Sequence, residues 1–271
     1  MNIAIYKTTK IYIACLANIA TGGPELLHQL AFHLINDLNI PAFMYYYDFD
    51  NSKFRTPVHP EYEFYNVPYT LEISEKEDIK ESILIVPEII ISLSLLPRYK
   101  SIRKGIWCLS VDNYYFSRIT KKDFFFKRVL NKLLALIHKP QLFDIFSEDN
   151  LKKLTKKYDY RFDSLLKMSD FYMTNSYRGM NWFKELKPLY YLSEYLNPNF
   201  LKTHTDLSNK ENIVAYNPKK GIEYTNKIIR FANNNITFIP IINMNRDDVI
   251  KTLQRAKVYI DFGNHPGKDR M

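Results

Sequence analysis

The stretch that decides the fold is residues 11–34, IYIACLANIATGGPELLHQLAFHL. Its first part, residues 11–17, is apolar without a polar alternation, a pattern typical of a strand buried on both faces of a sheet. A glycine-containing turn interrupts this run, and apolar residues then recur at helical spacing over residues 25–38. A buried strand that leads through a tight turn into an amphipathic helix predicts the opening unit of a parallel α/β sheet.

The same alternation continues along the chain. Further strands are expected at residues 41–49, 62–73, 82–90, 104–112, 169–177 and 188–195, and an amphipathic basic helix at residues 123–139. Strands that alternate with helical stretches indicate a parallel sheet covered on both faces. The sequence therefore predicts an N-terminal Rossmann-like domain over residues 1–196.

A second alternation follows residues 197–211, a polar segment without periodicity that we interpret as a linker. Residues 212–271 contain three apolar runs, NIVAYN, ITFIPII and VYIDFG, with helical stretches between them. A βαβαβ unit of this size is half of a doubly wound domain. We expect a chain of two Rossmann-like parallel-sheet domains, the second of them incomplete.

Composition excludes several classes of protein. With 271 residues, 46% of them hydrophobic and 25% charged, the chain is expected to bury a core rather than stay disordered. Cys15 and Cys108 are too few for a disulfide framework or a four-thiolate zinc site. No run of about 18 apolar residues predicts a membrane span, and the N-terminus does not read as a secretory signal. We therefore expect a cytoplasmic protein.

The chain is basic, with a net charge of +9, which implies an anionic partner such as nucleic acid, anionic lipid or a phosphorylated small molecule. The helix expected at residues 123–139 concentrates cations beside phenylalanines and leucines. One interpretation is peripheral contact of this helix with the inner face of an anionic membrane. The other is that its apolar face packs into the core and leaves a solvated basic face.

Two glycines, Gly22 and Gly23, stand between the first strand and the first helix. Glycine lets a backbone approach a ligand closely, and the helix N-terminus favours phosphate or carboxylate. This predicts a ligand-facing loop at the carboxyl edge of the sheet, with a simple tight turn as the alternative. The loop is not G-x-G-x-x-G, so the dinucleotide fingerprint is absent.

Acidic residues follow two other strands of the first domain. Asp112 is a candidate general base, or a group that orients an acceptor hydroxyl, and Asn113 beside it is a candidate contact; an Asx turn or helix cap is the alternative. Asp48 and Asp50 stand at the end of the second strand. They fit a ribose hydroxyl, a divalent cation, or no ligand in a solvated loop.

Polar and cationic residues also follow strands of the second domain. Asn217, Lys219 and Lys220 end its first strand beside a helix start, which predicts a diphosphate clamp, with a solvated lysine pair as the alternative. The loop after the last strand carries His265, Lys268 and Arg270. Its cations are candidates for phosphate and its histidine for a hydroxyl, and the alternative is a frayed terminus.

The segments IWCLSVDNYY, VAYNPKKG and VYIDFGNHPGKDRM, together with two α/β units, resemble the GT-B class of glycosyltransferases. The closer similarity is to bacterial retaining transferases that build surface polysaccharides of the capsule or lipopolysaccharide type. The resemblance implies a nucleotide-diphosphate sugar as donor and a glycan or lipid-linked acceptor. It implies no metal, no cofactor and no nucleic acid partner.

The resemblance also implies roles for individual residues. It implies that Gly22 and Gly23 lie near the diphosphate and the transferred sugar, that Lys219 or Lys220 holds the diphosphate, and that Asp112 lies on the acceptor side. In the family a helix with a ribose-binding Glu follows the final loop, whereas this sequence ends at Met271, so an inactive relic is part of the hypothesis. Two alternatives stay open: a non-catalytic basic module that binds nucleic acid or an anionic membrane, and a nicotinamide oxidoreductase.

Overall fold

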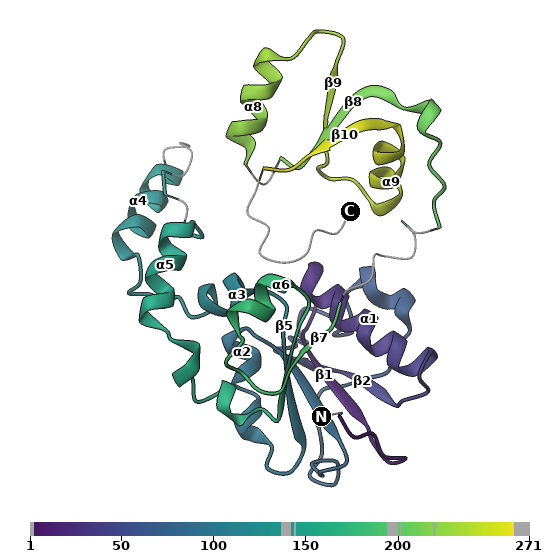
Figure 1. Cartoon of the computed structure of the whole chain (residues 1–271), viewed down its shortest axis with the longest axis vertical. Helices are drawn as coiled ribbons and strands as arrows, with labels where there is room; N and C mark the ends of the chain where they lie inside the picture. Colours follow the sequence, from purple (N-terminus) through teal and green to yellow (C-terminus); the bar gives the residue numbers. More distant parts are fainter. Residues whose placement is uncertain are drawn as a thin grey trace. The chain divides into compact units, whose positions relative to one another are not determined.

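A computed structural model describes residues 3–136, 142–143, 145–193, 200, 202–218 and 221–262. The chain divides into two compact units, Met1–Tyr195 and Leu196–Met271. Each unit contains its own sheet, and every strand pairing in both sheets is parallel (Figure 1). The prediction of an α/β protein with two parallel sheets is therefore confirmed.

The sheet of the first unit has seven strands in the order β3-β2-β1-β4-β5-β6-β7. The strands are β1 (Ile11–Leu16), β2 (Ala42–Tyr47), β3 (Tyr69–Thr70), β4 (Ile83–Pro87), β5 (Arg103–Cys108), β6 (Phe171–Thr174) and β7 (Leu189–Tyr191). This order is compatible with a Rossmann-like sheet extended by one strand. Strands β2 and β3 lie on one side of β1, and strands β4 to β7 lie on its other side. The strand order therefore reverses between β1 and β4.

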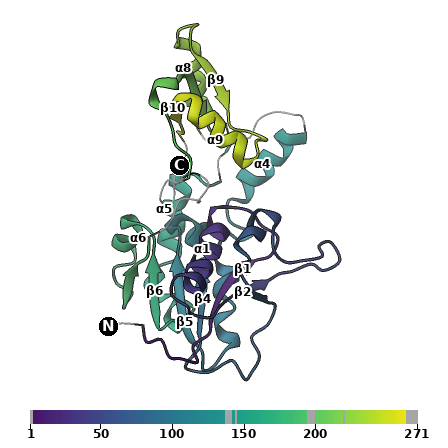
Figure 2. The same cartoon turned by 90° about the vertical axis from the view of Figure 1, so that its right-hand side faces the viewer.

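Helices cover both faces of this sheet. The helices of this unit are α1 (Gly22–Asn36), α2 (Ile90–Leu93), α3 (Val111–Phe116), α4 (Phe125–Leu136), α5 (Glu148–Lys157) and α6 (Tyr177–Trp182), of which α4 lies away from the sheet. Figure 2 shows α1 crossing in front of β1 and β2, where Leu26 and Leu27 enter the core around Cys15. A second core, around Cys108 and Tyr114, lies on the opposite face. Both cysteine thiols are buried and free.

One predicted strand is wrong. Residues 62–73 form a 3₁₀ helix, Pro60–Tyr65, and only the two-residue strand β3. Pro60 stands at the helix start, and His59 Nδ1 caps it by accepting the Glu61 amide at 3.2 Å. Proline at the first position and a capping acceptor before it outweigh the β-propensity of the aromatic residues that follow.

The second unit has three strands in the order β10-β8-β9. Its elements are β8 (Glu211–Tyr216), α8 (Ile222–Phe231), β9 (Thr237–Pro240), α9 (Arg246–Arg255) and β10 (Ala256–Ile260). The order again reverses beside the first strand, here between β8 and β10. Its fully buried apolar core consists of Ile213, Ala215 and Ala256 among the residues described.

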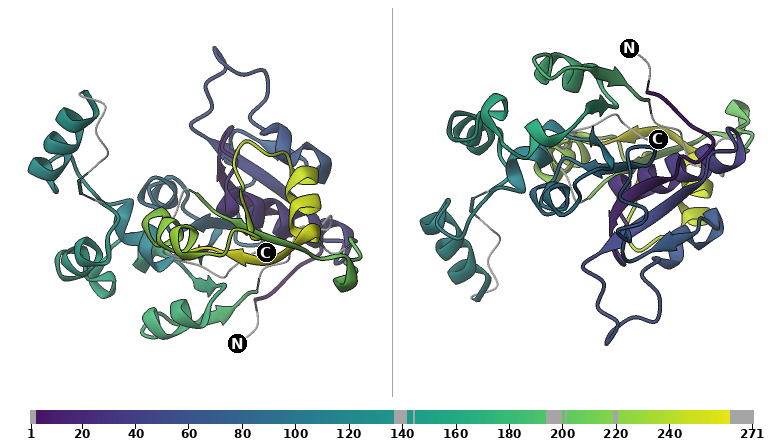
Figure 3. Two further views of the ribbon diagram at one scale, coloured as in Figure 1. Left: turned by 90° about the horizontal axis from the view of Figure 1, so that it is seen from above. Right: turned by 90° about the horizontal axis from the view of Figure 1, so that it is seen from below.

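Figures 1 and 3 show α4 at the outer side of the first unit, away from its sheet, whereas α5 packs against α3 and buries Leu151 and Leu154 in the core. Both α4 and α5 belong to the long connection between β5 and β6. None of the helices in the described ranges combines the length and the hydropathy that crossing a bilayer requires.

Candidate functional site

Open parallel sheets bind ligands outside the carboxyl ends of their strands, at the point where the strand order reverses. In the first unit this point lies beyond Leu16 of β1 and Pro87 of β4. The loops that follow β1, β4 and β5 supply the residues at this edge. Gly22, Gly23, Asp112 and Asn113 all belong to these loops or to the helices that start there.

The loop after β1 is held from one side by residues 56–62. The backbone amide of Asn18 donates to the Pro57 oxygen at 2.9 Å, and its side chain donates to the Thr56 oxygen at 2.8 Å. The Tyr62 hydroxyl donates to the Thr21 oxygen at 2.8 Å. The loop is therefore braced in one conformation although Thr21 and Gly22 are exposed.

Gly22 and Gly23 form the first turn of α1, and Thr21 before them makes no side-chain capping hydrogen bond. Within the described part of the chain, the amides of Gly22 and Gly23 have no hydrogen-bond acceptor. A Cβ built on Gly23 would lie 3.7 Å from Leu109 Cδ1, which is an ordinary contact. Packing within the unit therefore does not require a glycine at position 23. The first-turn amides of α1 are available to an anionic ligand at this edge of the sheet.

Glu88 lies at the reversal point and is a residue that the sequence analysis missed. It directly follows β4, is only 2% exposed, and its Oε2 accepts the Leu109 amide at 2.9 Å. Burial penalises the carboxylate and raises the pKa of Glu88 to about 7. In the sequence, a glutamate directly after the apolar run ILIVP could have indicated this residue. The strand expected at residues 82–90 extended past the end of β4 and so included Glu88.

Asp112 is buried in the first turn of α3, with its side chain 2% exposed. Its Oδ1 accepts a hydrogen bond from the Arg178 guanidinium at 2.6 Å, and the Arg178 side chain is 42% exposed. The helix cap is Ser110, whose Oγ accepts the Asn113 amide at 3.1 Å; Asn113 itself is exposed. The structure thus pairs Asp112 with an arginine of α6 that the sequence did not single out.

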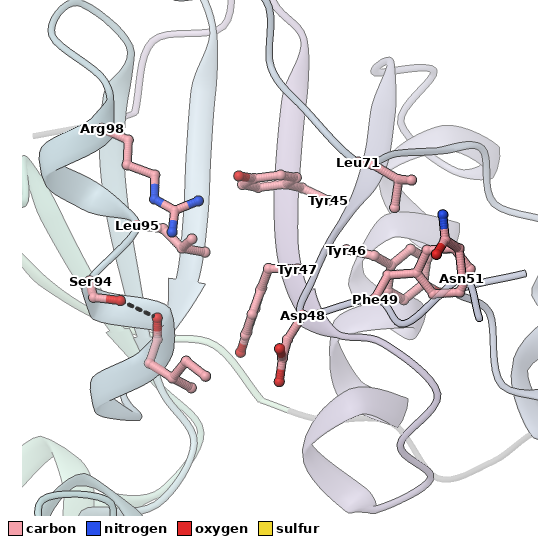
Figure 4. Close-up of a pocket in the computed structure, with 11 residues that line it drawn as sticks. Tyr45, Tyr46, Tyr47, Asp48, Phe49, Asn51, Leu71, Ser94, Leu95 and Arg98 are labelled. Atoms are coloured by element: carbon pink, nitrogen blue, oxygen red, sulfur yellow. Dashed lines mark hydrogen bonds between the residues drawn. The ribbon is translucent and has the colours of Figure 1, made fainter. Parts of the chain in front are cut away.

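The second acidic pair lies at the end of β2. Asp48 is exposed with a positive φ of 58°, while Asp50 accepts from Ser52 Oγ at 2.5 Å and pairs with Lys53 at 2.7 Å. Asp48 lines a pocket of about 460 Å³ (Figure 4). The pocket is lined by aromatic and polar side chains: Tyr45, Tyr46, Tyr47, Asp48, Phe49, Asn51, Leu71, Ile91, Ser94, Leu95 and Arg98.

In Figure 4 the side chains of Arg98 and Tyr45 point toward one another across this pocket. The Tyr45 hydroxyl accepts from Tyr99 at 2.9 Å, and the Tyr47 hydroxyl contacts Ser92. Arg98 and Asp48 have no side-chain partner among the described residues. The pocket therefore offers fixed tyrosine rings together with one cation and one anion, a combination suited to a polar ligand with apolar faces.

In the second unit, Asn217 lies at the reversal point between β8 and β10. Its backbone amide donates to the Ile260 oxygen at 3.2 Å, and its side chain donates to Asp261 Oδ2 at 3.0 Å. Gly221 has a φ of 56°, and a Cβ there would lie 2.6 Å from the Phe262 carbonyl, so this glycine is explained by the fold. Lys219, Lys220, His265, Lys268 and Arg270 lie outside the described residues.

Over the residues that are described, no three His, Cys, Asp or Glu side chains gather as metal ligands would. No protein-family model matches the chain, and no curated protein matches its sequence.

Proposed function

We propose that this protein is a glycosyltransferase that transfers a sugar from a nucleotide-diphosphate sugar to a surface-glycan acceptor. The observation that carries the proposal is the start of α1 at the reversal point of a parallel sheet, where the amides of Gly22 and Gly23 have no acceptor among the residues that the structure describes. The parallel sheet of the second unit and the resemblance of its VAYNPKKG segment to GT-B enzymes support it.

The chemistry follows from where charge develops. Glycosyl transfer builds positive charge on the sugar and negative charge on the leaving diphosphate. The amides and the positive dipole end of α1 would stabilise the diphosphate in a preorganised way, at no cost of reorganisation. Lys219 and Lys220, which follow Asn217 in the sequence of the second unit, are cations of the type that binds diphosphate.

The acceptor is proposed to occupy the pocket at the end of β2. Tyr45 and Tyr47 would contact the faces of sugar rings, while Arg98 and Asp48 would hydrogen-bond to hydroxyls. Arg98→Ala is expected to raise the KM for acceptor and leave donor binding unchanged. A variant that weakens donor and acceptor equally would count against this assignment.

Asp112 is proposed to act on the acceptor side through Arg178, because its own carboxylate is buried against that guanidinium. In this role Asp112 is a positioning residue, and Arg178 is the group that reaches solvent. Asp112→Asn should lower kcat, with partial rescue by Asp112→Glu. Two buried free thiols are consistent with a reducing, cytoplasmic place of action.

The test is calorimetric titration of the chain with UDP, GDP, CDP and ADP. One of these nucleotides is expected to bind saturably, and Gly23→Val to weaken it at least about tenfold by filling the space at the α1 start. Ser147→Val is the control, since Ser147 stands before α5 without capping it through its side chain, and the change adds a valine at a helix start outside the proposed site. Absence of binding to all four nucleotides would overturn the proposal.

A nicotinamide dinucleotide is the second candidate ligand. The strand order of the first sheet and the position of Asp48 after β2, where an acidic residue can hold ribose, favour it. Including NAD in the same titration separates the two proposals. Binding of NAD that exceeds binding of every nucleoside diphosphate would favour the oxidoreductase.

A further inference from the structure

Helix α4 turns its polar side inward. Asn131 is buried, and its side chain donates to the Phe143 oxygen at 2.6 Å while accepting the amides of Leu142 and Phe143 at 3.1 and 3.0 Å. One turn earlier, Lys127 Nζ donates to Asn150 Oδ1 of α5 at 3.0 Å. These polar contacts fix which side of α4 faces the protein.

The opposite side of α4 is apolar and exposed. Phe126 is 85% exposed and Leu136 is 76% exposed. The full set of exposed apolar side chains on this helix is Phe125, Phe126, Val129, Leu130, Leu133 and Leu136. At 3.6 residues per turn these positions fall within one arc of about 140°. The interpretation that the apolar face of this helix packs into the core is therefore wrong over the described residues 125–136.

Cations border one edge of this apolar arc and precede the helix. Lys132 is exposed and adjoins its edge, and Arg128 lies beyond Lys132 on the same side, while Lys121 and Lys122 precede the helix. Across residues 121–157 the sequence has ten lysines and arginines against four aspartates and glutamates. This region thus accounts for about two thirds of the net charge of the chain.

An apolar arc bordered by cations fits the boundary between acyl chains and anionic headgroups. A second copy of the same helix fits less well, because pairing two arcs would bring like charges together. We propose that α4 docks the protein on the surface of an anionic lipid bilayer, lying in its plane with Phe126 and Leu133 inserted. The inference does not depend on the proposed glycosyl transfer.

The test is co-sedimentation of the full chain with vesicles of equal parts phosphatidylglycerol and phosphatidylcholine. The wild type should sediment with these vesicles, less so at high salt, and poorly with phosphatidylcholine alone. The double variant Phe126→Gln with Leu133→Gln should lose on the order of tenfold or more in partitioning. Because both side chains are exposed, the variant should keep its far-UV circular dichroism.

The matched control is Phe231→Gln in α8, a phenylalanine that is 90% exposed in the second unit. It should sediment like the wild type. Three results would overturn the proposal: no sedimentation of the wild type, equal sedimentation with neutral vesicles, or no loss in the double variant. A dimer in light scattering that the double variant abolishes would also overturn it, since a second copy would then be the occupant.

Discussion

Helices α1 and α4 belong to the same unit and share an amphipathic pattern, yet they face opposite ways. α1 buries Leu26 and Leu27 against the sheet. α4 buries Asn131 and leaves Phe126 and Leu133 in solvent. The comparison shows that hydrophobic periodicity identifies an apolar face but does not identify what covers it.

The chain connections explain the difference. α1 joins two neighbouring parallel strands, β1 and β2, so the crossover places it on the sheet. α4 lies in the long connection between β5 and β6 and is fastened to the start of α5 by polar side chains. Because this connection is long, it does not force α4 to pack on a face of the sheet.

The largest expected contrast comes from truncating one leucine in each helix. Leu27→Ala should lower the free energy of unfolding by about 2–5 kcal/mol, because it leaves a cavity in the core. Leu133→Ala should change it by less than about 0.5 kcal/mol, because that side chain already meets water. Denaturant unfolding measures both, and equal losses would show that α4 is covered in solution.

The next largest effect on the free energy of unfolding is expected from protonation of His28 in α1. Burial lowers the pKa of His28 to about 4, with its ring held by the Pro24 oxygen at 2.7 Å and the Tyr46 hydroxyl at 2.6 Å. Because this value is below that of the unfolded chain, His28 contributes stability above about pH 6.5 that is lost as the pH falls toward about 4. The change is up to about 3 kcal/mol.

The measurement is the free energy of unfolding of the wild type and of the His28→Gln variant, determined by denaturant unfolding across this pH range. The difference between the two should shrink as the pH falls, since the variant has no group to titrate there. A difference that stays constant would mean that His28 is accessible to protons in the folded state.

The polar anchor of α4 predicts a smaller, local effect. Asn131→Ala leaves the oxygen of Phe143 and two amides without partners, at a cost of about 1–3 kcal/mol. Hydrogen exchange over residues 125–136 should accelerate while exchange over α1 stays unchanged. The control is Asn36→Ala at the exposed end of α1, which should leave exchange in both helices as it is.

The smallest effect concerns the stability of the α1 start. Gly23→Ala should change the free energy of unfolding by less than about 1 kcal/mol, because the added Cβ meets only Leu109 at an ordinary distance. Thermal unfolding checks this. A large loss would mean that the glycine serves packing, and the ligand argument for it would fail.

Much of the fold was accessible from the sequence because parallel strands buried on both faces read as continuous apolar runs. β1, β4, β5 and β8 were recognised in this way, although the strand expected at 104–112 ran on to Asp112, which lies in α3. The partner of Asp112 was not accessible, because Arg178 lies on a separate helix and nothing in a single sequence marks such a pair.

Other errors have local causes. The ends of β4 and β5 were drawn too late because apolar residues continue into the following turns, which concealed Glu88 at the edge. The orientation of α4 was ambiguous because one buried asparagine and one lysine contact, rather than the apolar pattern, decide it.

The most direct test of the account is hydrogen exchange at the first turn of α1 with and without a saturating nucleoside diphosphate. The amides of Gly22 and Gly23, which have no acceptor among the described residues, should exchange rapidly alone and at least about tenfold more slowly with the nucleotide. Exchange in α4 should not change. A nucleotide that binds without slowing Gly22 and Gly23 would contradict the central claim.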